Sequence, residues 1–265
     1  MNSRIIWLWI ASVLSALLTG VAGKECTSED NSYTISSPED VIKYFDGCTT
    51  INSDRIIIRN TYEGPFVLPT VTKITGTIRC EYNSGMTRPA VIPALEAPDL
   101  LYLGALEIQE ADSLTNISFP QLETVAGGIS IGSTAEYVHT SFPALTESGS
   151  LSIRARFSNL NFPSLTKVRN DLTVDFCPSC PPPFAKRSVS FPSLQSAGYV
   201  RLVGAITSSV PCFSSMAYTH IQVALTCRCL LLSGHQLAEM DAQRIPASRF
   251  ICTRKILAEP SLYRN

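Results

Sequence analysis

The cysteines of this 265-residue chain are its most abundant reactive side chains, and there are nine of them. Cys177 and Cys180 have the C-x-x-C spacing of thiol–disulfide oxidoreductases, but such a site also needs a helix start beside a βαβ unit. Here the pair lies in the proline-rich stretch 175–190, so we expect a disulfide that staples a loop. A zinc site is not expected, because no second cysteine pair lies at ligand spacing with a histidine available.

Other catalytic side chains are sparse. The three histidines, His139, His220 and His235, lie far apart in the sequence. No Ser/His/Asp order and no phosphate-binding loop stands out, so we predict no catalytic residue and no cofactor. Charged residues make up 16% of the chain and the net charge is −1. A chain without a basic excess is poorly suited to a phosphate backbone, so we expect no nucleic-acid partner.

The cysteine content indicates an oxidising compartment, and the N-terminus agrees. Residues 1–23 contain Arg4, an apolar run over 5–18 and small residues at 21–23, which is typical of a secretory signal peptide. The apolar run is shorter than the roughly 20 residues of a transmembrane anchor, so we expect secretion and no transmembrane span.

Two further features concern modification. Asn116-Ile117-Ser118 is the N-glycosylation sequon of the chain, so we expect a glycan on Asn116 in an exposed insertion. Residues 256–265 are too polar for the hydrophobic tail of a GPI signal, which is about 10–20 residues long. The sequence as written therefore predicts an extracellular chain that lacks a GPI tail.

A repeat organises most of the chain. A motif of an apolar residue, proline, any residue and Leu or Val occurs at 68–71, 92–95, 119–122, 142–145, 162–165 and 191–194. Apolar-x-apolar triplets start at residues 56, 78, 101, 129, 151, 172, 200 and 221. Two residues before seven of these eight triplets lies Gly, Asn or Asp, the residues that best tolerate left-handed backbone. Two longer intervals predict insertions at 103–119, where 105–108 could form an extra strand, and at 175–190.

Each repeat is interpreted as a short strand and a return segment stiffened by proline. The outer triplet residues share one face of the strand and should be buried, while the middle residue should face solvent. One coil cannot bury its own apolar face, so successive coils must stack with their strands paired in parallel. The sequence therefore predicts a mainly β, right-handed parallel solenoid over residues 24–227, either leucine-rich-repeat-like or β-helix-like. The alternative is a β-sandwich with strands spaced by chance.

A helix should cover the N-terminal end of this solenoid. Ser37 is a good N-cap and Pro38 a good first helical residue, and acidic residues follow in the first turn. Val41, Ile42 and Phe45 fall on one face, which we expect to cap the open core.

The opening segment and the repeat together resemble a known family. Cys26, the run Tyr-Thr-Ile-Ser-Ser-Pro-Glu-Asp-Val and Cys48-Thr-Thr-Ile resemble the start of receptor L domains. The unit Phe-Pro-x-Leu-x-x-Val/Ala-x-x-x-Leu-x-Ile resembles the fungal GPI-anchored cell-wall organisation proteins with this fold. The resemblance implies an extracytoplasmic glycoprotein that contributes to cell-wall integrity and has no known catalytic centre. The chain departs from that family in lacking a Ser/Thr-rich stalk and a GPI tail.

The remaining cysteines are assigned from their positions. Cys26 and Cys48 flank the capping helix, so we expect a disulfide that pins it. Cys80 occupies an inward triplet position and should stay a free, buried thiol. Four cysteines near the C-terminal end supply two further bonds of undetermined pairing: Cys212, Cys227, Cys229 and Cys252.

The C-terminal tail, residues 228–265, has no repeat triplet. Residues 24–225 carry 14 Lys/Arg and 19 Asp/Glu, whereas residues 226–265 carry 6 and 3. The tail is therefore atypical, either as an alternative C-terminus or as an extra cap.

Three classes of function can be considered for such a chain. A non-catalytic wall or surface protein follows from the resemblance, with a wall polysaccharide or mannoprotein as its partner. A ligand-binding module is the alternative, with Tyr102, Arg154, Asp175 and Arg201 as its face. An enzyme that cleaves polysaccharides is disfavoured, because Asp175 is the one outward acid that the triplets and their flanks provide and such chemistry needs two carboxylates.

Overall fold

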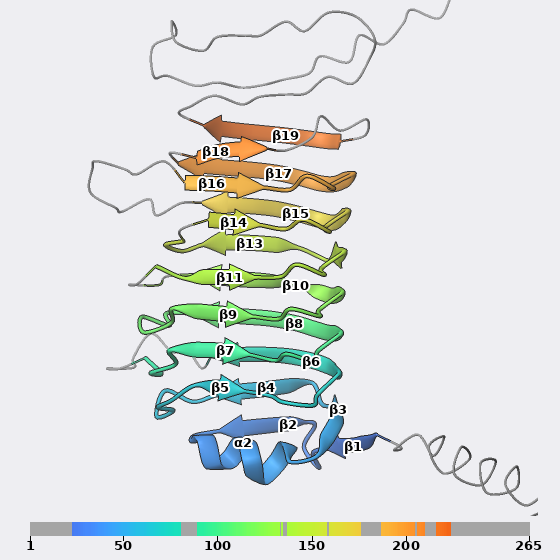
Figure 1. The fold of residues 1–265 in the computed structure, drawn as a ribbon, viewed down its shortest axis with the longest axis vertical. Helices are drawn as coiled ribbons and strands as arrows, with labels where there is room; N and C mark the ends of the chain where they lie inside the picture. The colour runs from blue at the N-terminus through green and yellow to red at the C-terminus, as the bar shows by residue number, and fades with distance from the viewer. Residues whose placement is uncertain are drawn as a thin grey trace, which may run out of the picture.

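The parallel strands of this chain stack into a β-solenoid, seen as successive rungs in Figure 1. The computed structural model describes residues 23–80, 89–132, 134, 137–157, 159–175, 187–204, 206–209 and 216–223. Side chains are described up to residue 202, except that of Arg187. The prediction of a mainly β parallel solenoid is confirmed, and every strand pairing in the described residues is parallel.

The elements follow one another in a repeating order. The capping helix is α2 (Pro38–Phe45). The strands are β1 (Lys24–Thr27), β2 (Ser32–Ile35), β3 (Cys48–Asn52), β4 (Arg55–Ile58), β5 (Phe66–Val67), β6 (Lys73–Cys80), β7 (Ala94–Glu96), β8 (Tyr102–Gln109), β9 (Asn116–Ser118), β10 (Thr124–Gly132), β11 (His139–Ser141), β12 (Glu147–Ser148), β13 (Leu151–Arg154), β14 (Asn159–Asn161), β15 (Lys167–Asp175), β16 (Arg187–Ser190), β17 (Ser196–Gly204), β18 (Ile206–Ser209) and β19 (Met216–Val223).

Three sheets enclose the core. The large sheet has twelve strands, and its main path runs β1-β3-β6-β8-β10-β12-β15-β17-β19. The return segments form a four-stranded sheet, β11-β9-β7-β5, and a three-stranded sheet, β14-β16-β18. The return segments thus contain strands, which agrees with the extended conformation that the sequence predicts for them.

Side chains alternate between core and solvent as the triplets predicted. Ile129 and Ile131 on β10 are each 1% exposed, and Ser130 between them is partly exposed. Ile129 is in register with Leu151, and Leu151 with Leu172, so each coil places its apolar residues directly above those of the coil before. Burial of this continuous column stabilises the solenoid, because one coil alone would leave the column exposed.

One predicted triplet is wrong. The residue in register with Ile78 and Ile129 is Leu106, not Leu101. Leu101 is 41% exposed, whereas Leu106 is fully buried. The in-register triplet is therefore 106–108, the segment expected to be an extra strand, and the longer interval falls between residues 78 and 106.

The triplet was predicted too early because the turn of this coil uses a different proline from the one in the predicted motif. The turn of this coil is Ala97-Pro98-Asp99-Leu100, closed by a hydrogen bond from Leu100 N to Ala97 O of 3.4 Å. The predicted motif at 92–95 instead overlaps β7, whose Leu95 pairs with Ile117. Both segments have the pattern proline, any residue, leucine. The spacing of the repeat therefore did not show which of them forms the turn. At the C-terminal end the last triplet is shifted similarly, because Val200 pairs with Thr219 and not with Ile221.

The Phe-Pro-x-Leu motif forms the turn between a return strand and the large sheet. In the coil of β9, Leu122 N donates to Phe119 O over 3.3 Å, with proline in the second position of the turn, where its fixed φ fits. Four phenylalanines from successive turns stack in one buried column, with centroids 5.4–5.6 Å apart: Phe119, Phe142, Phe162 and Phe191.

The glycines before the triplets have a different role from the predicted one. Gly76, Gly104 and Gly149 do not adopt positive φ; positive φ occurs at Gly47 and Gly64 among the described glycines. A Cβ at Gly104 would overlap the carbonyl oxygens of Thr75 and Gly76, and one at Gly149 would overlap that of Gly127. The strand register of the large sheet shifts here, an irregularity that we call the bend, and the backbone of the preceding coil leaves no room for a side chain.

Helix α2 covers the N-terminal end. Asp40 Oδ2 accepts hydrogen bonds from the backbone N–H groups of Ser36 (2.8 Å) and Ser37 (3.2 Å), which fixes the helix start. Val41 and Phe45 are buried, and the Phe45 ring packs edge-on against Tyr33 with centroids 4.9 Å apart. Ile42, expected on the same face, is 67% exposed, so the buried face of the helix is narrower than predicted.

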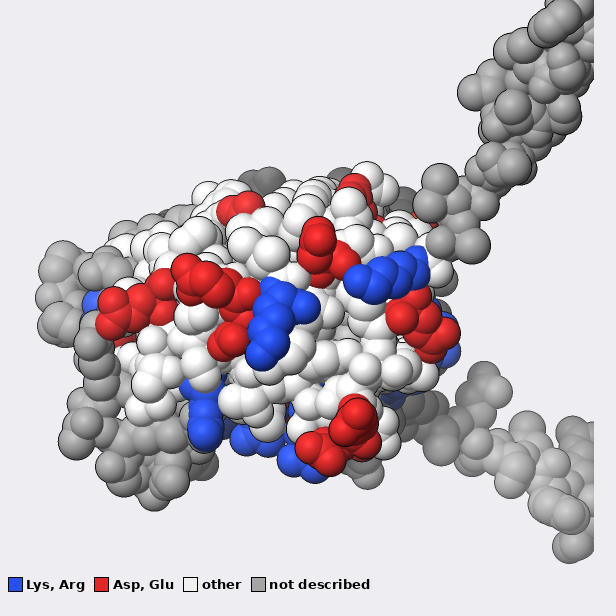
Figure 2. Space-filling view, turned by 90° about the horizontal axis from the view of Figure 1, so that it is seen from below, with Lys and Arg blue, Asp and Glu red and all other residues white. Residues whose placement is uncertain are grey.

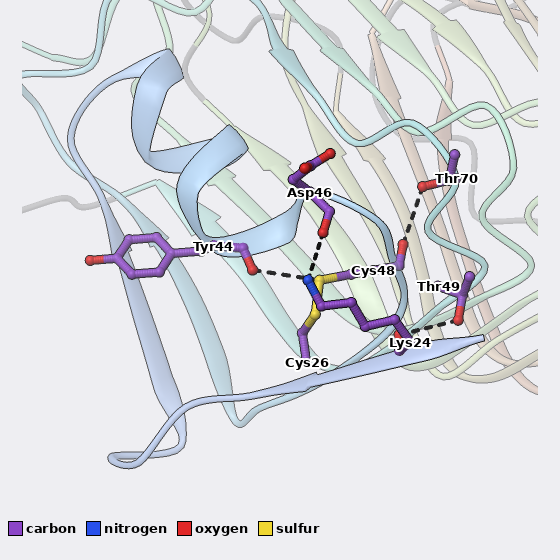
Figure 3. Close-up of a disulfide and its surroundings, with 7 residues drawn as sticks. All are labelled: Lys24, Cys26, Tyr44, Asp46, Cys48, Thr49 and Thr70. Atoms are coloured by element: carbon purple, nitrogen blue, oxygen red, sulfur yellow. Dashed lines mark hydrogen bonds between the residues drawn. A yellow bond between two sulfur atoms is a disulfide. The ribbon is translucent and has the colours of Figure 1, made fainter. Parts of the chain in front are cut away.

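The disulfide expected beside this helix is present (Figure 3). Cys26 on β1 and Cys48 on β3 are bonded, with their Cα atoms 5.9 Å apart. Lys24 Nζ donates to the carbonyl oxygen of Asp46 over 2.8 Å, and Thr49 Oγ1 donates to Lys24 O over 3.2 Å. The first strand is therefore tied both to its neighbour and to the end of α2.

Candidate functional site on the outer face of the large sheet

Three of the four residues predicted as a ligand face lie on neighbouring coils. Arg154, Asp175 and Arg201 come from the C-terminal parts of β13, β15 and β17. Arg201 Nη1 lies 3.7 Å from Asp175 Oδ2, and the two side chains are 33% and 13% exposed. Asp175 Oδ1 is buried without a hydrogen-bond partner, whereas Arg154 is exposed. This group is mainly an ion pair beside the stretch 176–186, which lies outside the described residues.

Tyr102 lies elsewhere on the sheet. It begins β8, before the bend, whereas the other three residues lie after it. Register connects it with residues of the adjacent coils in one straight row along the solenoid. We call the five consecutive members the Tyr102 row: Lys73, Tyr102, Thr124, Glu147 and Lys167.

The Tyr102 row faces solvent because it alternates with buried residues. Leu103, Val125 and Val168, each the next residue along its strand, are at most 1% exposed. Side chains of the row therefore stand outward from the sheet. Neighbouring members are separated by one strand spacing, about 4.8 Å.

Two contacts fix side chains within the row. Lys73 Nζ lies over the Tyr102 ring, 5.6 Å from its centroid, in a cation–π arrangement. Glu147 Oε1 accepts from Arg169 Nε over 2.7 Å and lies 3.3 Å from Lys167 Nζ. These hydrogen bonds, with the Arg169 bond as the larger cause, lower the pKa of Glu147, which stays ionised.

The outer face carries more acid than the sequence indicated. Glu107 on β8 is exposed and in register with Arg79, and Glu147 is a further outward carboxylate. Glu107 was missed because the triplet of its coil was placed five residues too early. Glu147 precedes the bend and was therefore not counted among the triplet flanks. Among the described residues no three His, Cys, Asp or Glu side chains group as metal ligands.

Asn116 does not lie in an exposed insertion. It is the first residue of β9, between Ala94 and His139 in the four-stranded sheet, and it is partly buried. Its Nδ2 atom, which would carry a glycan, donates to Glu96 Oε1 over 2.8 Å. A glycan on Asn116 remains a prediction, and it would be attached to the nitrogen atom that donates this hydrogen bond.

Cys80 is free and 5% exposed, as expected for an inward triplet residue. Burial raises the pKa of its thiol to about 12, so it is an inert core residue. The other predicted disulfide cysteines lie outside the described residues: Cys177, Cys180, Cys212, Cys227, Cys229 and Cys252.

Charge on the visible surface is mixed. Figure 2, which views the end covered by α2, shows acidic and basic side chains interspersed with uncharged surface. No helix within the described residues has the length and apolar character that crossing a membrane requires.

Comparison with known proteins finds a relative named "Cell surface GPI-anchored protein" from Arthroderma benhamiae (strain ATCC MYA-4681 / CBS 112371), 33% identical over 106 residues. The match covers 39% of this chain and 26% of the relative. No family model and no solved structure matches the chain. The relative supports the cell-surface part of the family resemblance, and the receptor L-domain assignment has no support from these comparisons.

Proposed function

We propose that this chain is an extracellular, non-catalytic glycoprotein that contributes to the organisation and integrity of a fungal cell wall. The observation that carries the proposal is the parallel solenoid formed by the described residues, whose in-register coils present one continuous outer sheet. The named relative supports the cellular setting, because it is a cell surface protein of a fungus.

The proposed absence of catalysis follows from the arrangement of polar groups. Two carboxylates of the outer face are engaged by cations, Glu147 by Lys167 and Arg169, and Asp175 by Arg201, whereas Glu107 is exposed. A glycosidase needs one carboxyl group kept protonated as a general acid. Ion pairing has the opposite effect on Glu147, because it lowers the pKa of that carboxyl.

The experiment has two parts. Deleting the gene should make the producing cells more sensitive to wall-perturbing dyes, and re-expression of the full chain should restore resistance. Purified chain incubated with wall polysaccharides should release no oligosaccharide. Unchanged wall resistance would contradict the wall role, and product release abolished by Asp175→Asn or Glu147→Gln would contradict the non-catalytic assignment.

A ligand-binding module is the second candidate. The observation that favours it is the Tyr102 row, which presents an aromatic ring and charged groups in one line on the solvent face. This candidate is compatible with a role in the cell wall, because a module that binds a wall component could contribute to wall organisation through that binding.

A further inference from the structure

The outer face of the return strands carries less charge than the Tyr102 row, which contains two lysines and a glutamate. Buried residues alternate along β9, β11, β14 and β16 with residues that face solvent. We call the eight outward residues of these strands the return face, and each is Asn, Ser or His: Asn116, Ser118, His139, Ser141, Asn159, Asn161, Ser188 and Ser190. Charge lies at the margins of this face, at Glu96 on β7 and at Arg156 before β14. The four strands stack one above another, so the return face extends over consecutive coils (Figure 1).

Asn116, the first residue of the sequon, has a fixed orientation on this face. Its Nδ2 atom donates one hydrogen to Glu96 Oε1 over 2.8 Å, and Glu96 belongs to the preceding coil. A primary amide nitrogen carries two hydrogens, and the second points away from the first. The second hydrogen of Nδ2 therefore points away from Glu96, and the following coil with β11 lies on that side. Because Asn116 is partly exposed, a sugar bonded in place of that hydrogen reaches solvent over β11.

The coil of β11 places an aromatic ring beside that position. Tyr137 is 49% exposed and stands outward like His139, because Val138 between them is 1% exposed. His139 is in register with Asn116, so Tyr137 is a diagonal neighbour of Asn116, one strand spacing across and two residues along. The Cα atoms of such a pair lie about 8 Å apart. A sugar attached to Asn116 is therefore within reach of the Tyr137 ring.

We infer that the N-glycan of Asn116 lies on the return face, with its first sugar units against Tyr137 and the next ones over β11 and β14. This inference rests on the proposed function, which makes the chain an extracellular glycoprotein, and it specifies where the glycan packs. Glycosylation joins C1 of the first sugar to Nδ2 while the C1–O bond to a lipid pyrophosphate donor breaks. The pyrophosphate leaves with the bonding electrons, and Nδ2 releases one proton to the transferase. The glycosylated nitrogen keeps one hydrogen, which stays available to Glu96 Oε1.

The chemistry of the return face suits this occupant. Serine hydroxyls, asparagine amides and neutral imidazole each donate and accept hydrogen bonds, as sugar hydroxyls do. Covering the face therefore buries no unpaired charge, whose burial would be costly. From β9 to β16 the face spans three strand spacings, about 14 Å, which an oligosaccharide of a few units can cover. The carbon atoms of a sugar ring also gain dispersion contacts with the exposed Tyr137 ring.

A matched pair of variants at Ser118 tests the inference in the full secreted chain. Ser118→Ala abolishes the sequon and Ser118→Thr keeps it, and both variants leave Asn116 and Glu96 unchanged. Peptide mapping by mass spectrometry should find one glycan on Asn116 in Ser118→Thr and none in Ser118→Ala.

Hydroxyl-radical labelling of the two variants then measures how accessible each tyrosine is. Because a sugar against the ring covers one of its two faces, labelling of Tyr137 should be slower by about twofold or more in Ser118→Thr than in Ser118→Ala. Tyr199, which is partly exposed on the large sheet, is the internal control. Its labelling rate should be the same in both variants.

Three results would overturn the inference. One is an unmodified Asn116 in the secreted parent chain. The second is equal labelling of Tyr137 in the two variants when circular dichroism shows intact β-structure in both. The third is protection of Tyr137 that rises with protein concentration in both variants alike, which would assign the face to a second copy of the chain. None of these results bears on the wall role, which the deletion phenotype tests separately.

Discussion

Phe142 and Phe162 stack with ring centroids 5.6 Å apart and an interplanar angle of 13°, although they come from different coils. Both rings are at most 1% exposed. They occupy the same position in successive Phe-Pro-x-Leu turns, so their stacking shows that successive turns are aligned within the core.

Shortening one ring of this stack should cost stability. Phe142→Ala removes a buried ring that contacts Phe119 on one side and Phe162 on the other. We expect a loss of about 3–5 kcal/mol in the free energy of unfolding, measured by urea denaturation. Phe142→Leu, which keeps most of the buried volume, should lose clearly less. Equal losses for the two variants would contradict the packing role of the ring.

The bend of the large sheet predicts a difference between two glycines. Gly149→Ala should cost about 2 kcal/mol or more, because its Cβ would overlap the Gly127 carbonyl oxygen. Gly127→Ala is the matched control at the same bend, since its Cβ would lie 3.1 Å from the Gly104 carbonyl oxygen. Thermal denaturation of both variants checks the order, and a Gly127→Ala loss as large as that of Gly149→Ala would refute it.

The disulfide should stabilise the N-terminal end. Cys26 and Cys48 are 22 residues apart in sequence, and closing such a loop contributes about 3 kcal/mol. The double variant Cys26→Ser/Cys48→Ser should lose about this much, measured by denaturation without reductant. A reductant should destabilise the parent chain by breaking this disulfide. The double variant lacks the bond and cannot lose stability in this way. Equal stability of parent and variant would show that the bond does not hold the cap.

Alkaline pH should weaken the fold through Cys80. Its folded pKa is raised from 9.0 to about 12 by burial, so the folded chain holds the proton more tightly than the unfolded chain. This stabilisation is complete below pH 9 and is lost as the pH rises toward 12. Tyr62, also raised to about 12, chiefly by burial and then by the charge of Glu39, adds a loss that begins nearer pH 10.

Cys80→Val separates these two groups. The variant keeps an apolar side chain in the core and should show a flatter stability profile between pH 9 and 10. Denaturation midpoints at a series of pH values provide the measurement. A profile with the same slope as that of the parent chain would mean that Cys80 is not the titrating group.

The sequence contained enough information for most of the architecture. The triplets at 129, 151, 172 and 200 are in register as predicted, because each Phe-Pro-x-Leu turn sets the start of the next strand. The register failed at Leu101, where two proline motifs five residues apart compete and the true turn contains Ala97 in place of phenylalanine. The two motifs are distinguished by the pairing of Leu95 with its neighbouring strands. This pairing depends on residues far away in the sequence.

The candidate site was less predictable. Tyr102 was singled out as an outward residue, but its neighbours Lys73, Thr124 and Glu147 precede the bend and belong to no triplet. Their alignment depends on the coil-to-coil register, which a single coil does not reveal. The glycines were recognised as a repeated feature, yet their cause is the backbone of the preceding coil and not a left-handed conformation.

The compartment of the mature chain tests the central claim most directly. Producing cells are fractionated into cytosol, wall and medium, and the peptides that contain Cys26 and Cys48 are mapped by mass spectrometry with and without reduction. The account predicts that the chain is found in the wall or medium, with these two peptides linked until reduction. A chain confined to the cytosol, with both thiols free, would contradict it.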